Sequence, residues 1–162
     1  MKMKTLTKLI LFVTLVSVVT LTGCKKNEES GTPGVPSNGS MTLKHDGNAW
    51  SATLSVQAVN DNGVLNVTGS DSNANQSSII ISPVNGVGTY KIGPSGGTGH
   101  QGRWTQGLNQ TDSYVASFVI GTGEVTITEL TDSKAKGTFK FTGYNTDQNT
   151  VQVTDGEFDV TF

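Results

Sequence analysis

From Met41 to the end of the chain, apolar and polar residues alternate with a period of two. This period is typical of β-strands that bury one face, whereas an amphipathic helix repeats about every 3.6 residues. The alternating segments cover residues 50–58, 65–67, 79–81, 90–92, 114–118, 125–127, 139–141, 151–153 and 158–162. Threonines occupy many of the outward positions, where a β-branched polar side chain suits a solvated sheet face.

Polar turn sequences separate these segments. Asp46-Gly47 and Asp155-Gly156 each lie between alternating runs, and residues 60–63 (NDNG) reverse the chain after the first long segment. Asp-Gly favours a type I′ turn because both residues tolerate a positive φ, so we expect a hairpin at each pair. About eight to ten strands at this spacing predict an all-β fold, either an antiparallel β-sandwich or a flattened meander β-barrel.

Residues 1–23 have the parts of a signal peptide. Lysines at positions 2, 4 and 8 precede an apolar run over residues 9–21. A membrane-spanning helix needs about 20 apolar residues, whereas the apolar region of a signal peptide has about 7 to 15. We therefore exclude residues 1–23 from the fold.

Leu21-Thr22-Gly23-Cys24 resembles the lipobox of bacterial lipoproteins. The resemblance implies that diacylglycerol is attached to the Cys24 sulfur, that cleavage precedes Cys24, and that the new amino group is acylated, for example with palmitate. Two or more acyl chains anchor a protein stably, whereas one chain is marginal. The alternative is an ordinary signal peptide with an incidental cysteine. Because Cys24 is the only cysteine, the chain has no internal disulfide to form.

Residues 24–40 are the predicted acylated N-terminus and tether. They are rich in Gly, Ser, Pro and charge, and they cannot bury enough apolar surface to offset the entropy of ordering. Lys25 and Lys26 stand where some bacteria place an aspartate that retains lipoproteins in the inner membrane, so an outer-membrane location is favoured. Glu28 and Glu29 resemble surface-export signals of Bacteroidetes-type lipoproteins. The sequence leaves open whether the domain faces the periplasm or the outside.

Residues 41–162 are predicted to form a single domain. Its charge is not that of a nucleic-acid-binding protein. Without residues 1–23 the chain has 8 basic and 13 acidic residues, a formal charge of −5. A basic stripe with interleaved aromatic residues, typical of nucleic-acid binding, is absent. His45 and His100 lack the spacing of a metal site, so the sequence indicates no metal and no cofactor.

Four stretches resemble a family of small uncharacterised lipoproteins of Bacteroidetes-type bacteria. They are LKHDGNAWSA (43–52), GTYKI (88–92), GEVTITELTDSKAKGTFKFTG (123–143) and TDGEFDV (154–160). The resemblance implies an all-β exported domain of unknown role. None of these stretches is a catalytic signature, so the resemblance assigns no functional residues.

The glycine-rich loop of residues 93–107 matches the letters of two chemical motifs. Residues 97–102 fit GxGxxG, which binds a pyrophosphate only where a strand leads into a helix, and no helical pattern follows. Residues 93–97 fit GxSxG around Ser95, but the only later histidine, His100, lies in the same loop. A hydrolase that uses Ser95 is therefore the least favoured function.

Two groups of acidic and amide residues have plain structural interpretations. Asp71, Asn73 and Asn75 begin like a calcium loop, but the later positions lack the required glycine and glutamate, so a polar turn is favoured. Glu157 and Asp159 share one face of the last strand and invite comparison with a glycosidase pair. A charged outer face is the favoured interpretation, because their neighbours do not favour a protonated carboxyl.

The aromatic residues provide the remaining candidates. Trp50 is in phase with apolar residues and is expected in the core. Trp104 follows the glycine-rich loop beside Arg103, and an exposed indole next to a guanidinium can stack on a sugar ring. Trp104, Arg103 and His100 are therefore candidate ligand contacts. For Trp104 itself, a tryptophan that plugs one end of the barrel is the favoured interpretation over ligand contact.

The sequence therefore favours a non-catalytic binding module at the outer membrane, with a glycan, peptide or protein ligand. The alternative is an accessory subunit of an envelope assembly that has no small ligand.

Overall fold

A computed structural model describes residues 37–97 and 99–162. The predicted signal peptide, Cys24 and most of the predicted tether lie outside the described residues. Among the residues that are described, no helix is long and apolar enough to span a membrane.

The described chain forms eleven strands and one short 3-10 helix, η1 (Gln110–Asp112). The strands are β1 (Gly39–His45), β2 (Asn48–Ser51), β3 (Ser55–Asp61), β4 (Val64–Ser70), β5 (Gln76–Ile81), β6 (Gly88–Ile92), β7 (Gln101–Thr105), β8 (Ser113–Ala116), β9 (Thr122–Leu130), β10 (Lys134–Tyr144) and β11 (Thr150–Thr161).

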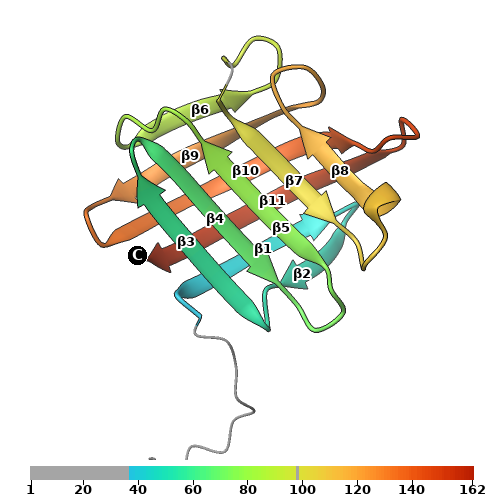
Figure 1. The fold of residues 1–162 in the computed structure, drawn as a ribbon, viewed down its shortest axis with the longest axis horizontal. Helices are drawn as coiled ribbons and strands as arrows, with labels where there is room; N and C mark the ends of the chain where they lie inside the picture. Colours follow the sequence, from blue (N-terminus) through green and yellow to red (C-terminus); the bar gives the residue numbers. More distant parts are fainter. Residues whose placement is uncertain (1–36, 98) are drawn as a thin grey trace, which may run out of the picture. The chain divides into compact units, whose positions relative to one another are not determined.

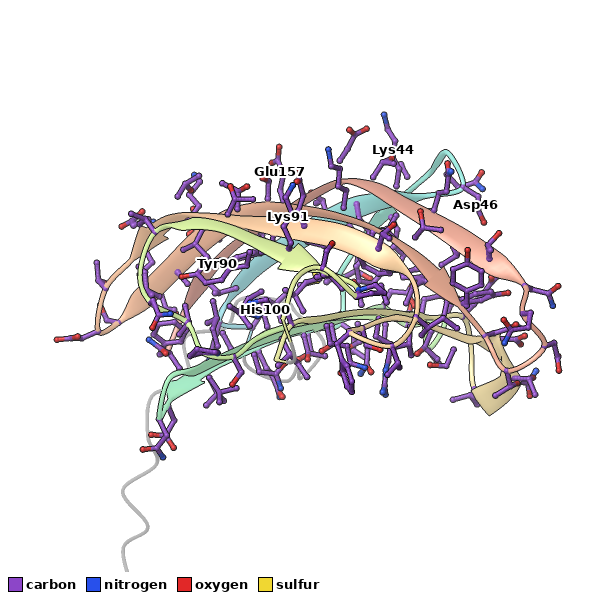
Figure 2. The ribbon with its side chains drawn as sticks, turned by 90° about the horizontal axis from the view of Figure 1, so that it is seen from above. Lys44, Asp46, Tyr90, Lys91, His100 and Glu157 are labelled. Atoms are coloured by element: carbon purple, nitrogen blue, oxygen red, sulfur yellow. The ribbon has the colours of Figure 1, made fainter. Side chains whose placement is uncertain are left out.

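All eleven strands belong to one antiparallel sheet that curls until two layers face each other (Figures 1 and 2). The first layer contains β6, β9, β10, β11, β1 and β2, and the second contains β8, β7, β5, β4 and β3. β10 joins the layers because it pairs with β9 and β11 and, through Tyr144, with Val115 of β8. The two layers are also joined next to β1, where the N–H of Asn38, the residue before β1, donates to the carbonyl of Val56 in β3 at 2.8 Å. The predicted all-β fold of a sandwich or flattened barrel is confirmed.

Inward side chains fill the space between the layers. The largest fully buried ones are Trp104, Phe158, Met41, Leu65, Ile79, Ile81 and Ile127. Trp50 is also buried, as the sequence predicted. Period-two alternation therefore sorted core from surface along most strands.

The predicted single strand over residues 50–58 is wrong. β2 ends at Ser51 in the first layer, and β3 begins at Ser55 in the second. The residues between them cross from one layer to the other, and the Leu54 N–H donates to the Ser70 carbonyl at 3.0 Å. Leu54 lies at this crossing and is 47% exposed rather than in the core.

A similar correction applies to Phe118, which the alternation placed on a buried face. β8 ends at Ala116, and the next residues form a tight turn in which Ser117 and Ile120 exchange backbone hydrogen bonds. Phe118 lies in this turn and is 49% exposed.

Two of the expected turns form as predicted. Asp46-Gly47 connects β1 to β2 with φ angles of 47° and 82°. Asn62-Gly63 connects β3 to β4 with φ angles of 50° and 77°. Positive φ at both central residues is the conformation that a type I′ hairpin turn requires.

The hairpin expected at Asp155-Gly156 is wrong, because β11 continues through this pair. Phe139 of β10 is opposite Gly156, but Phe141 is opposite Val153, so β11 carries one extra residue. Asp155, with a φ of 50°, lies in this β-bulge. A bulge uses the same left-handed backbone that a turn uses, without reversing the chain.

Candidate functional site

Trp104 and Arg103, two of the three predicted ligand contacts, are adjacent in sequence but lie on opposite faces of β7. Trp104 is 0% exposed, stacks on His45 at a centroid distance of 4.6 Å and meets Trp50 edge-on at 5.2 Å. The indole is therefore buried, and the less favoured interpretation of Trp104 as an exposed ligand contact is wrong. Successive strand residues point to opposite faces, so Arg103 lies on the outer face of the second layer.

His100 lies between the two layers, where the glycine-rich loop enters β7 (Figure 2). Its Nδ1 accepts a hydrogen bond from the Ser82 N–H at 3.2 Å, and its ring meets Tyr90 edge-on at 5.4 Å. Burial lowers the pKa of His100. The position of His100 is thus set by Ser82 and Tyr90.

Arg103 is exposed among uncharged residues of the second layer. No carboxylate in the described part of the chain forms an ion pair with it. A hollow of about 430 Å³ beside Arg103 is also lined by Leu108, whose side chain is 89% exposed. The prediction that Arg103 contacts a ligand is compatible with this exposure.

Asp71 and Asn145 are buried and build two equivalent turns. Asp71 Oδ1 accepts from the N–H groups of Asn73 and Asn75 at 2.8 and 3.0 Å. Asn145 Oδ1 accepts from the N–H groups two and four residues later, at 3.1 and 2.8 Å. Asn145 Nδ2 also donates to the Thr111 carbonyl at 2.9 Å, which fixes the loop after β7. The role of Asn145 was not predicted.

The other carboxylate oxygen of Asp71, Oδ2, accepts from Trp50 Nε1 at 2.8 Å and from Asn75 Nδ2 at 2.9 Å. Burial raises the pKa of Asp71, but the hydrogen bonds from Asn75, Trp50 and Asn73 outweigh burial and lower it overall. Both carboxylate oxygens of Asp71 therefore accept hydrogen bonds from N–H groups, as expected for a polar turn. Within residues 37–97 and 99–162, no group of three or more His, Cys, Asp or Glu side chains could hold a metal.

The outer face of the first layer carries a line of four threonines and one glutamate, here called the hydroxyl row. It runs across five strands, and each member lies opposite the next in the strand register: Thr89, Thr126, Thr138, Glu157 and Thr42. The Thr89 and Thr126 hydroxyls are 3.0 Å apart and share a hydrogen bond. At about 4.8 Å per strand, the row is about 19 Å long.

Ion pairs flank the hydroxyl row on both sides. On one side Glu124 binds both Lys91 and Lys140, and Lys44 binds Asp155 at 2.9 Å. On the other side Asp159 binds two lysines, with N–O distances of 3.3 Å to Lys134 and 3.4 Å to Lys136, and Glu129 also contacts Lys134 at 3.4 Å. All five lysines of the described residues lie on this face.

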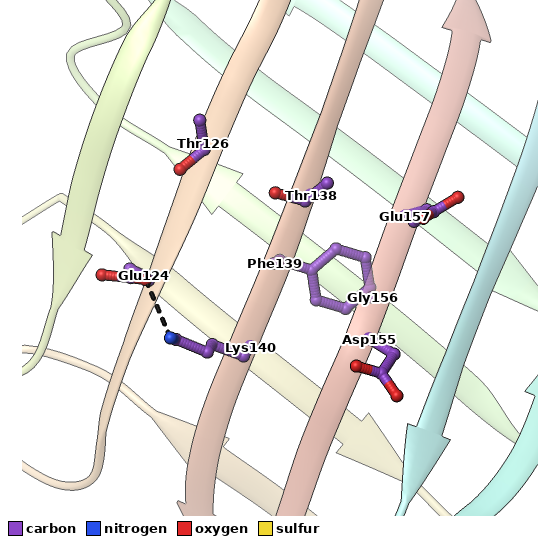
Figure 3. A pocket seen from close by; sticks show the side chains of 8 residues that line it. All are labelled: Glu124, Thr126, Thr138, Phe139, Lys140, Asp155, Gly156 and Glu157. Carbon is purple, nitrogen blue, oxygen red and sulfur yellow. Dashed lines mark ion pairs between the residues drawn. The ribbon is translucent and has the colours of Figure 1, made fainter.

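The hydroxyl row forms the floor of a shallow groove, because threonine is shorter than the lysines on either side. Two hollows of about 410 and 400 Å³ lie along it and share Thr138 and Glu157. Figure 3 shows Thr126, Thr138 and Glu157 in line on β9, β10 and β11, beside Glu124, Lys140 and Asp155. We call this depression the transverse groove.

The ion pairs hold two of the groove's carboxylates in their charged form. Hydrogen bonds from Lys91 and then Lys140 lower the pKa of Glu124, and the hydrogen bond from Lys134 lowers the pKa of Asp159 despite its partial burial. A catalytic acid needs a raised pKa, so this geometry does not support Asp159 as the acid of a glycosidase pair with Glu157.

These features define an all-β domain with a filled interior and a polar groove on one outer face. The chain belongs to the family described as domain of unknown function DUF6252, whose model matches residues 37–160. The match confirms the resemblance to an uncharacterised family. The chain matches no curated protein and no solved structure.

Proposed function

We propose that this domain is a non-catalytic binding module whose transverse groove takes a glycan. The observation that supports this most is the hydroxyl row, about 19 Å long, between two rows of paired charges. A hydroxyl-rich chain that lies across the strands would exchange hydrogen bonds with each member of the row. The strand ladder holds these side chains in place, which reduces the entropy lost on binding.

The location of the groove favours a glycan over an extended peptide. Peptides that add to sheets gain affinity from backbone hydrogen bonds at a free edge. The two hollows of the groove lie over β9, β10, β11 and β1, and each of these strands is hydrogen-bonded to a strand on both sides. A ligand here must bind through side chains. The lining phenylalanines Phe139 and Phe158 are buried, so we expect weak affinity without aromatic stacking.

We also propose that lipid on Cys24 holds this module at the outer membrane of a Bacteroidetes-type cell. The lipobox-like residues 21–24, the short apolar run before them and the absence of an aspartate after Cys24 support this proposal.

The second candidate is an accessory subunit of an envelope assembly. Three exposed apolar side chains favour it, namely Leu108 in the loop after β7 and Phe118 and Val119 in the turn after β8. A stable partner should then be recovered in mild detergent, and substitution of Phe118 and Val119 by serine should release it.

A glycan array tests the binding proposal directly. The mature chain with Cys24→Ser, which cannot be lipidated, should bind a subset of glycans. Thr138→Val removes one hydroxyl from the groove at nearly constant shape and should weaken that binding. Thr68→Val makes the same change on the second layer and should leave it unchanged. Retention of no glycan at micromolar to millimolar concentrations would contradict the proposal.

A further inference from the structure

The charges on the groove face are equal in number but unequally paired. Five lysines and five carboxylates lie on the strands of this face, and every lysine has at least one carboxylate within 4.0 Å. Glu124 and Asp159 each bind two lysines, while Asp155 and Glu129 take part in the remaining contacts. Of the five carboxylates on the strands of this face, Glu157 alone makes no ion pair with a described residue.

Glu157 belongs to the hydroxyl row along the transverse groove rather than to the ion pairs on either side of it. In the register it lies between Thr138 of β10 and Thr42 of β1, and it lines both hollows. Its side chain is exposed and lies on the outer side of the first layer, like those of Lys44 and Lys91 (Figure 2). A ligand in the groove therefore meets one negative charge that no lysine of the groove neutralises.

We propose that the ligand carries a free amino group and that Glu157 binds the ammonium. This inference rests on the proposed function and specifies the ligand as a glycan that contains unacetylated amino sugars. A hydrogen bond from an ammonium to a carboxylate is about twice as strong as one between neutral groups. The paired charges on both sides leave Glu157 as the point in the groove where a cation gains most.

The hydroxyl row distinguishes an amino sugar from a lysine side chain as the source of the ammonium. Thr126, Thr138 and Thr42 offer donors and acceptors that match sugar hydroxyls on both sides of the amine. A lysine side chain offers only its ammonium, whereas an amino sugar carries hydroxyls beside the amine on the same ring. The observations therefore favour the sugar.

The test titrates the mature Cys24→Ser chain with three tetrasaccharides: a glucosamine oligomer, its N-acetylated form and a neutral glucose oligomer. We expect the glucosamine oligomer to bind about tenfold more tightly than the other two. Glu157→Gln should remove this preference while weak binding of all three persists. Asp132→Asn, which changes the net charge equally in the turn between β9 and β10, should preserve the preference.

The outcomes separate this inference from the proposed function. Equal binding of the amino and acetylated oligomers would overturn the inference and leave a glycan-binding groove. Failure of every oligomer to bind, together with an empty glycan array, would overturn both. Binding of tetralysine as tight as that of the glucosamine oligomer, with the same loss in Glu157→Gln, would overturn the assignment to a sugar.

Discussion

Gly156 of β11 lies directly opposite Phe139 of β10, and the Phe139 ring occupies the space where a side chain at position 156 would begin. A Cβ on Gly156 would lie 2.6 Å from the ring and 2.5 Å from the Phe139 carbonyl oxygen. Two residues further along, the glycine is on β10 and the phenylalanine on β11. There the Phe158 ring covers Gly137 in the same way. The inner side of the groove layer is therefore packed by phenylalanine rings over glycines.

Gly156→Ala should destabilise the domain by about 2 kcal/mol, because a methyl group there overpacks a filled core. Urea unfolding followed by tryptophan fluorescence measures the loss. Thr146→Ala, in the exposed turn after β10, serves as the control and should change stability by less than about 0.5 kcal/mol. Unchanged stability in Gly156→Ala would mean that the Phe139 ring does not cover position 156 as described.

Asp71→Asn should destabilise the domain by about 1 to 3 kcal/mol, because a buried N–H group then loses its acceptor. An amide in place of the carboxylate retains one acceptor oxygen, whereas Asp71 uses two to bind Trp50 and Asn75. Asp147→Asn is the matched control in the equivalent turn, where residue 147 is exposed. Equal effects of the two substitutions would contradict the structural role of the Asp71 carboxylate.

The stability of the domain should fall as the pH drops below about 6.5, through His100. Burial lowers the folded-state pKa of His100 from its ordinary value of 6.5. The unfolded chain therefore binds this proton more readily, and stability rises with pH until it levels off near 6.5. Protonation would also remove the acceptor for the Ser82 N–H.

Urea unfolding between pH 5 and 7.5 checks this dependence, with His100→Gln as the comparison. The pH dependence should be smaller in the variant. Glu124 and Asp159 contribute at lower pH, since their pKa values are lowered from 4.5 and 3.8 and their stabilisation is lost only as the pH falls through those lowered pKa values. An unchanged slope in His100→Gln would assign the effect to other groups.

Cys24→Ser should move the protein from the membrane fraction to the soluble fraction of the cell. The reason is that acyl chains on one sulfur and one amino group supply the proposed anchor. Mass spectrometry of the native protein should find the added mass on residue 24. An unmodified Cys24 in membrane-associated protein would contradict lipid anchoring.

Period-two alternation predicted the all-β fold and most of the core. Successive residues of a strand point to opposite faces, so the buried face can be recognised from the order of apolar and polar residues alone. Asp155-Gly156 is a case in which the local sequence did not predict the structure. The pair predicted a positive φ, which Asp155 adopts, but the pairing of β11 with β10 and β1 decides that the backbone forms a bulge. Trp104 shows a second limit. Gly102, two residues before it, suggested that the loop continued to this point. In the structure Gly102 is part of β7 and lies under the Phe141 ring, so Trp104 is a strand residue that faces the core.

The groove could be predicted only in part. Outward positions for Thr126, Thr138 and Glu157 follow from the alternation. Their alignment in one row depends on the register between strands far apart in sequence, such as β6 with β9 and β1 with β11. The unpaired state of Glu157 depends on which lysines reach Glu124 and Asp159, so sequence alone indicated only a charged face.

The most direct test of the account is an NMR titration of the isotope-labelled mature Cys24→Ser chain with the glucosamine tetrasaccharide. We expect amide and side-chain signals of Thr126, Thr138 and Glu157 to shift together and to saturate, while the signals of Arg103 and Ser78 on the second layer stay constant. Shifts confined to the second layer, or no saturable shift at the groove, would contradict the claim that the transverse groove is the binding site.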